Sequence, residues 1–212
     1  MTDERKRIVA RGYDALVDRY LEWSAQGADP TRDGLLAEFV SRLPGGAAVL
    51  DLGCGAGVPT TRLLAERFRV SGVDVSAGQV QAARRNVPQA TFIHTDLAAL
   101  QLPEASFDGI AALFSIIHVP REEHAGLFGQ IARWLRPGGL FVASLGANDG
   151  PDWTGDWLGQ PMFFSSFDAP TNRRLLRDAG FELLVDDVVE VREPDGPVPF
   201  LWVLARSLPA GG

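Results

Sequence analysis

The residues with the clearest chemical potential stand in one short stretch, 49–57, where Asp51 is followed by three alternate glycines that begin at Gly53. Glycine lacks a Cβ, so the backbone can turn sharply there and let a ligand approach it closely. An apolar strand that runs into such a loop and then into a helix forms a nucleotide pocket in open α/β sheets. A dinucleotide fingerprint needs a glycine where Val58 stands, so the spacing argues against a dinucleotide.

Two further carboxylates stand where predicted strands end. Asp74 lies about twenty residues after the glycine loop, where a carboxylate can accept hydrogen bonds from both hydroxyls of a ribose. The alternative is that Asp74 or Ser76 caps the helix that follows. Asp96 follows the next strand. The alternative to a ligand contact at Asp96 is again a cap, here for the turn over 97–100.

His118 is the best candidate for a general base. It lies at the carboxyl end of the fourth predicted strand, where open α/β sheets place ligands. A neutral imidazole there could accept the proton of a phenol or an enol at physiological pH. The alternative is that His118 packs behind the ligand and orients a loop. We expect His94 at a strand end and His124 on the solvated side of a helix, and this scatter of histidines predicts no metal site.

Alternating strands and helices must position these groups. This alternation predicts a mostly parallel sheet that is covered by helices on both faces. A turn over 194–197 predicts that the last two strands form an antiparallel hairpin. We predict strands over 47–52, 69–74, 91–94, 107–114, 140–144, 181–191 and 198–205, and helices over 3–25, 31–43, 59–68, 77–86, 121–135 and 168–179. Thr31 is the predicted N-cap of the second helix, which follows a break over 26–30.

Bulk properties exclude several classes of function. The chain has 212 residues and a formal net charge of -7, which disfavours a large basic surface for nucleic acid. Its single cysteine cannot form an internal disulfide, which suits a reducing compartment and predicts a cytoplasmic protein. The longest apolar run, 110–117, is too short to cross a bilayer, so we expect a buried strand and no membrane partner.

Four features in this order resemble the class I S-adenosylmethionine-dependent methyltransferases. They are the Asp-x-Gly-x-Gly-x-Gly loop, Asp74, the pair Asp96 and Leu97, and the turn over 135–139. The resemblance covers about 47–205. It implies a Rossmann-like, doubly wound sheet of seven strands, mostly parallel with an antiparallel C-terminal strand. It also implies a single methyltransferase domain over 1–212, with lid helices over 1–43, a cofactor-binding core over 47–145, a substrate-side insertion over 146–167, and a C-terminal helix and hairpin over 168–206.

The resemblance also implies the cofactor, S-adenosyl-L-methionine, and the residues that hold it. Asp74 would bind the ribose, Asp96 and Leu97 the adenine, and Gly53 and Gly55 the methionine part. The residues implied at the cofactor are Tyr20, Asp51, Gly53, Gly55, Asp74, Val75, Gln79, Asp96, Leu97 and Phe114.

The methyl acceptor is predicted to be a small molecule, methylated on an oxygen of an aromatic or other specialised metabolite. Aromatic walls suit a flat apolar ligand, although the same side chains could instead pack the insertion onto the sheet. We expect the acceptor to touch Tyr13, His118, Trp153, Trp157, Met162 and Phe163. The alternatives are a cofactor-binding protein that does not methylate, such as a scaffold or cyclase, and a nicotinamide-dependent oxidoreductase. We expect a monomer or a homodimer.

Overall fold

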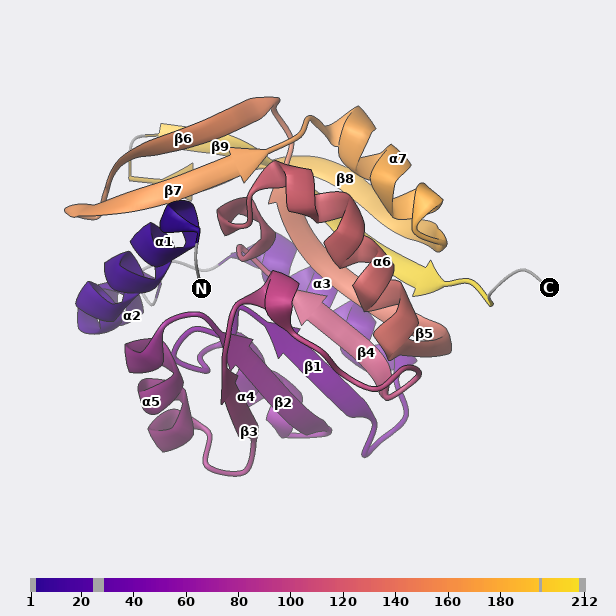
Figure 1. Ribbon diagram of the computed structural model, residues 1–212. Helices are drawn as coiled ribbons and strands as arrows, with labels where there is room; N and C mark the ends of the chain where they lie inside the picture. The colour runs from indigo at the N-terminus through magenta and orange to yellow at the C-terminus, as the bar shows by residue number, and fades with distance from the viewer. Residues whose placement is uncertain (1–2, 25–28, 195, 210–212) are drawn as a thin grey trace.

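The computed structural model describes residues 3–24, 29–194 and 196–209. Its centre is a seven-stranded sheet of order β3-β2-β1-β4-β5-β9-β8 (Figure 1). The first five of these strands run parallel, and β9 is antiparallel to β5 and β8, so the predicted fold class is confirmed. The strands are β1 Ala48–Leu52, β2 Arg69–Asp74, β3 Thr91–His94, β4 Phe107–Ala112, β5 Leu135–Gly146, β8 Phe181–Glu193 and β9 Gly196–Ser207.

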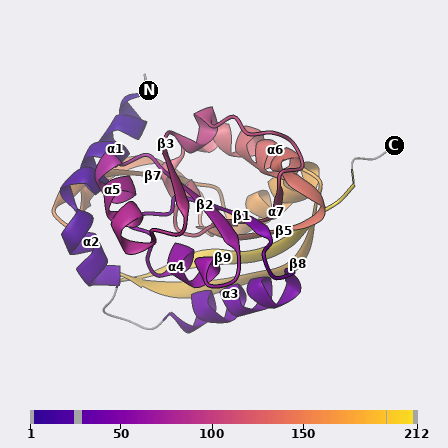
Figure 2. The same cartoon turned by 90° about the horizontal axis from the view of Figure 1, so that it is seen from below.

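Helices cover both faces of the sheet because its strands bury alternate residues on opposite sides. On β1, Leu50 and Leu52 face the cluster that includes α6, whereas Val49 faces the cluster that includes α3. Figure 2 shows α3 and α6 on opposite sides of the sheet. The helices are α1 Glu4–Ala15, α2 Val17–Ser24, α3 Pro30–Arg42, α4 Thr60–Ala65, α5 Ala77–Asn86, α6 His124–Trp134 and α7 Ala169–Asp178, with 3-10 turns over Leu97–Ala99, Ile116–His118 and Arg121–Glu123.

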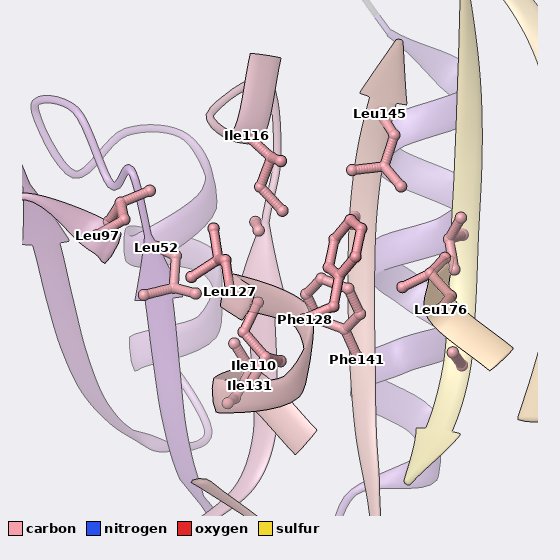
Figure 3. Packing of buried hydrophobic residues seen from close by; sticks show 14 of the residues in the cluster. Leu52, Leu97, Ile110, Ile116, Leu127, Phe128, Ile131, Phe141, Leu145 and Leu176 are labelled. Carbon is pink, nitrogen blue, oxygen red and sulfur yellow. The ribbon is translucent and has the colours of Figure 1, made fainter. Parts of the chain in front are cut away.

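The larger apolar cluster fixes the carboxyl ends of the central strands. Phe128 of α6 and Phe141 of β5 have ring centroids 6.5 Å apart, and both are fully buried (Figure 3). Burial of an aromatic side chain of this size stabilises the fold by roughly 1.5–3 kcal/mol. Ile116 extends this cluster into the turn after β4, which holds His118 close to the sheet edge.

Several predicted boundaries differ from the observed ones. The predicted helix over 3–25 is interrupted at Leu16, whose side chain is buried against Val9 and Phe163, so the chain forms α1 and α2 instead. The predicted break after it falls largely on 25–28, outside the described residues. The N-cap of α3 is Asp29 and not Thr31, because Pro30 takes the first helical position.

The fourth strand ends earlier than predicted, and the fifth strand begins earlier than predicted. β4 ends at Ala112 because Phe114 adopts a φ of 55°, which strand geometry excludes, and the backbone N–H of Phe114 donates to Ser144 Oγ at 2.7 Å. The apolar run over 110–117 is therefore part strand and part 3-10 turn. β5 begins at Leu135, not at 140, and Gly138 allows the irregular start with a φ of 79°.

The predicted insertion is a second, two-stranded sheet. β6 Gly150–Trp157 and β7 Gln160–Ser166 form an antiparallel hairpin that lies over α1 (Figure 1). The approach is close because Gly12 lacks a side chain: a Cβ there would lie 2.8 Å from Met162 Cε. The hairpin and the two N-terminal helices thus close over the carboxyl edge of the parallel strands. Among the described residues, no helix has the length and apolar character to cross a membrane.

Candidate active site

The glycine loop turns directly off β1 and contacts the next strand. The N–H groups of Gly53 and Cys54 donate to the carbonyl of Val73 at 2.8 and 3.0 Å. Gly53 has a φ of 76°, and a Cβ at this position would lie 2.2 Å from Ser115 Cβ. Both the backbone conformation and the lack of space therefore require glycine here.

Asp74 faces the loop from the end of β2. Its Oδ2 accepts the N–H of Gly55 at 2.8 Å, and its Oδ1 accepts the N–H of Ser76 at 2.9 Å. Burial raises the pKa of Asp74, while the backbone donors oppose this shift. Of the two predicted alternatives for the helix start, Ser76 is the cap, since its Oγ accepts the N–H of Gln79 at 3.0 Å. Asp74 thus lines the cavity while it anchors the loop.

Asp96 caps a short turn and lines the smaller cavity. Its Oδ1 accepts the N–H of Ala98 at 3.1 Å and caps the short 3-10 turn, and it also lines the cavity beside Leu97. Its Oδ2 accepts from Lys6 Nζ at 2.7 Å, and the same ammonium donates to Glu123 at 2.6 Å. Burial lowers the pKa of Lys6, but the two carboxylates outweigh burial and leave it above its usual value. The sequence reasoning missed Lys6.

Asp51 lies at the base of the loop and is almost fully buried. Thr61 Oγ1 donates to its Oδ2 at 2.6 Å. Burial raises the pKa of Asp51 to about 6, although the bond from Thr61 opposes the shift. A cation close to Asp51 would favour its ionised form, so the carboxylate suits a ligand with a positive group near the loop.

His118 is held between the hairpin and α1. Its Nδ1 lies 2.8 Å from the carbonyl oxygen of Phe163, which can only accept, so Nδ1 carries the ring proton. Burial lowers the pKa of His118 to about 4, so the ring is neutral and Nε2 is an acceptor. The hydroxyl of Tyr13 donates to Nε2 at 2.9 Å. His118 therefore tethers β7 through Nδ1 and lines the cavity with Nε2 unprotonated.

Two cavities meet at this histidine. The smaller reaches the strand ends at Asp74 and Asp96, and the larger opens toward α2 and the β8–β9 hairpin. Seven residues line both cavities and mark the place where they join: Tyr13, Tyr20, Gly53, Gly55, Leu113, Phe114 and His118. Val75, Leu97 and Lys6 line the smaller one, whereas Asp51, Trp157 and Phe164 line the larger one.

Four predicted site residues lie elsewhere. Gln79 is fully buried under the loop, and its Oε1 has no hydrogen-bond partner in the described chain. Met162 and Phe163 are buried against α1, because the hairpin uses them to pack onto that helix. Trp153 is 50% exposed, and its ring covers Gly155 and packs against Phe164. These four side chains do not line either cavity.

The larger cavity also has walls that sequence reasoning missed. Trp23 and Arg32 line it from α2 and α3, and residues 189–194 line it from the end of β8 and the turn that follows. No local motif marks these positions, because they meet the site only through the tertiary fold. His124 corrects another expectation: it is 2% exposed, and its Nε2 lies 2.9 Å from the carbonyl of Val119. Its spacing to the buried Leu127 and Phe128 of the same helix could have revealed this.

Comparison with known proteins decides the family. Residues 49–139 match the methyltransferase domain family. The chain is 33% identical to trans-aconitate 2-methyltransferase of Azoarcus sp. (strain BH72), with 89% of this chain and 82% of that protein covered. The chain belongs to the class I S-adenosylmethionine-dependent methyltransferases. This methyltransferase is also 32% identical to 27-O-demethylrifamycin SV methyltransferase of Amycolatopsis mediterranei (strain S699), where the match covers 66% of this chain but 58% of that protein.

A solved structure supports the cofactor. The Burkholderia thailandensis 1,6-didemethyltoxoflavin-N1-methyltransferase, which holds 1,6-didemethyltoxoflavin and S-adenosylhomocysteine, superposes with a TM-score of 0.73 at 25% identity. The match covers 97% of this chain and 90% of that one. The cofactor of this methyltransferase is S-adenosylmethionine, and its acceptor is a small molecule. In the described part of the chain, no group of three or more His, Cys, Asp or Glu side chains could hold a metal ion.

Proposed function

We propose that this methyltransferase transfers the methyl group of S-adenosylmethionine to an oxygen of a small aromatic or other specialised metabolite. The observation that carries this proposal is the neutral His118, whose Nε2 is an acceptor at the junction of the two cavities. An acidic O–H acceptor must lose its proton on transfer, and an imidazole nitrogen that is unprotonated and within reach can take it.

The residues of the smaller cavity fit the cofactor. Asp74 has lone pairs beyond its two backbone bonds and would accept from the ribose hydroxyls. Asp96 and Leu97 would meet the adenine, with Val75 beside it. Gly53, Gly55 and Tyr20 would surround the methionine part, and Asp51 would attract its amino group. The bound cofactor supplies a methyl group on a positively charged sulfur, which makes that methyl electrophilic.

Tyr13 and His118 would act together on the acceptor proton. The Tyr13 hydroxyl occupies His118 Nε2, and burial raises the pKa of Tyr13 well above its usual value. An acceptor O–H that reaches this pair can give its proton to Nε2 in place of Tyr13. The alternative, that His118 only orients β7, involves Nδ1, whereas Nε2 contacts only the Tyr13 hydroxyl that the acceptor would replace.

The walls of the cavity would promote the reaction mainly by aligning the acceptor with the methyl group and by excluding water. Tyr20, Trp157 and Phe164 form aromatic walls, and the N-terminal helices would act as a lid over the cofactor. Alignment of two reactants can lower a barrier by roughly 7–11 kcal/mol in favourable cases. A flat apolar metabolite with a few polar groups suits such walls.

The test is product analysis with a panel of phenols, enols, carboxylates and amines. We expect S-adenosylhomocysteine release together with an O-methylated product, identified by mass spectrometry and NMR. Calorimetry with S-adenosylhomocysteine gives an independent check of cofactor binding. Methylation of only nitrogen or carbon acceptors would overturn the oxygen assignment, and unmethylated turnover would support a cyclase-like protein instead.

A further inference from the structure

Three aromatic rings form a cluster at the outer end of the larger cavity. Tyr20 and Trp23 come from α2, and Trp157 ends β6. Their ring centroids lie 5.6–6.0 Å apart: Tyr20 stacks on Trp23 at 25°, and Trp157 meets these two rings at 49° and 74°. All three are only partly buried and line the cavity, so a ligand in the cavity would contact them. Aromatic faces of this kind attract cations through the ring quadrupole.

A carboxylate is hydrogen-bonded to the same cluster. Trp157 Nε1 donates to Glu193 Oε2 at 3.3 Å, and Glu193 lines the cavity at the end of β8. Burial raises the pKa of Glu193, and the bond from Trp157 opposes that shift. In the described chain no cationic side chain forms an ion pair with Glu193. A partly buried carboxylate without a counter-ion gains most from a ligand that brings one.

The other charged groups of the cavity do not neutralise Glu193. Arg32 lines the cavity, but both its Nε and its Nη2 donate to Asp33 Oδ1, at 3.0 and 2.9 Å. The cavity lining holds more carboxylates than guanidinium groups: Asp29, Asp51, Glu190 and Glu193 against Arg32 and Arg192. A concave site with an excess of one charge raises the local concentration of ligands of opposite charge.

We propose that Glu193 and the rings of Tyr20, Trp23 and Trp157 bind a cationic amino group on the methyl acceptor. This rests on the proposed function and narrows its substrate class to small hydroxyl compounds that also carry a protonated or quaternary amine. The amine would sit in the cluster, while the hydroxyl reaches His118, which lines the same cavity. Trp23, Trp157 and Glu193 lie outside the smaller cavity that holds Asp74 and Asp96, and Tyr20 lines both cavities.

Three phenols of matched shape test the charge preference. They are tyramine, which is cationic, 4-propylphenol, which is neutral, and 3-(4-hydroxyphenyl)propionate, which is anionic. Binding is measured by tryptophan fluorescence and calorimetry on the full chain saturated with S-adenosylhomocysteine. We expect tyramine to bind roughly tenfold more tightly than 4-propylphenol and the anion to bind weakest. Equal affinities, or no saturable binding of tyramine, would overturn the proposal.

Two variants separate the cluster from the rest of the cavity. Glu193→Gln keeps an acceptor for Trp157 Nε1 but removes the charge, so we expect tyramine affinity to fall roughly tenfold while 4-propylphenol is unaffected. Glu190→Gln, which makes the same charge change at an exposed position of the same cavity, is the control and should leave both affinities within twofold.

S-adenosylhomocysteine affinity distinguishes this proposal from the one on which it rests. It should be unchanged in Glu193→Gln. A loss of that affinity would show that Glu193 serves the cofactor's own amino group and would overturn the acceptor assignment. The proposed methyl transfer to oxygen has its own test. It would be overturned if S-adenosylhomocysteine binds but no acceptor gives an O-methylated product.

Discussion

At the cofactor edge, the hydrogen bond from Gly55 to Asp74 joins residues 19 positions apart in the sequence, within one strand–loop–helix–strand unit. At the acceptor side, Tyr13 bonds to His118 across 105 positions, and Trp157 bonds to Glu193 across 36. The first region is a local motif, and the spacing of its residues determines its geometry. The second is assembled from helices and two hairpins that have no fixed spacing. A fold of this kind can therefore keep the cofactor edge constant while the residues on the proposed acceptor side vary, since only the acceptor side must fit the acceptor.

The largest effect is expected at the tightest point of the cofactor edge. Gly53→Ala would place a Cβ 2.2 Å from Ser115 Cβ and force alanine into a φ of 76°, so we expect no measurable S-adenosylhomocysteine binding by calorimetry. Gly46→Ala is the matched control, because its φ of 75° is similar but its Cβ would meet nothing within 4 Å. It should cost about 1–2 kcal/mol of stability and leave binding intact. Similar behaviour of the two variants would contradict the close approach at Gly53.

At the acceptor side, His118→Ala should lower kcat by roughly a hundredfold or more, because it removes the acceptor for the substrate proton. Tyr13→Phe should have a smaller effect, since it removes the hydroxyl on Nε2 but leaves the base. Single-turnover kinetics at saturating cofactor measure both. S-adenosylhomocysteine affinity serves as the control, and an unchanged kcat in His118→Ala would leave the histidine only its tether to β7.

Folding stability should also report the burial of His118. Its pKa is about 4 in the folded chain and roughly 6.5 when unfolded, so the unfolded chain binds more protons between these values. Stability contributed by the neutral ring is present above pH 6.5 and is lost as the pH falls to 4, by about 3 kcal/mol. Urea denaturation of the wild type and His118→Gln at several pH values isolates this difference. Parallel pH profiles would show that the imidazole is not buried as neutral.

Asp74→Ala should weaken S-adenosylhomocysteine binding by roughly tenfold to a hundredfold, the value of one or more hydrogen bonds to a charged acceptor. The variant also leaves the N–H groups of Gly55 and Ser76 without their partners, so thermal unfolding must be measured in parallel. Asp108→Ala is the control, because Asp108 pairs with Arg136 at the other end of the sheet. It should change the binding constant by less than about twofold.

The smallest effect separates the two tryptophans of the hairpin. Trp153→Ala should change kcat/KM by less than about twofold, because the side chain is half exposed and lies outside both cavities. Trp157→Ala, in contrast, should reduce kcat/KM by roughly tenfold, since it removes an aromatic wall. Steady-state kinetics with any accepted substrate compare the two. Equal losses would mean that Trp153 reaches the acceptor after all.

The sequence by itself determined the parts that rest on local physics. Strand–helix alternation predicted the parallel sheet, and the glycine spacing with Asp74 predicted the cofactor edge, because parallel strands bring their carboxyl ends to one edge. A resemblance to the family added the cofactor. Aromatic content predicted an acceptor wall in 146–167 but could not tell which of its side chains line a cavity. Met162 and Phe163 read like pocket residues yet pack onto α1.

Only the tertiary structure decided which side chains line the larger cavity. Trp153 and Trp157 share one face of β6, and the position of the hairpin over the sheet decides that Trp157 lines the cavity whereas Trp153 is half exposed. The β8–β9 hairpin brought Glu193 to Trp157. Lys6 met Asp96 only because α1 lies across the strand ends. The physical reason is the same in each case. A side chain's partners across distant elements depend on how those elements pack, which no local pattern encodes, whereas a turn and its spacing are fixed by the few residues that form it.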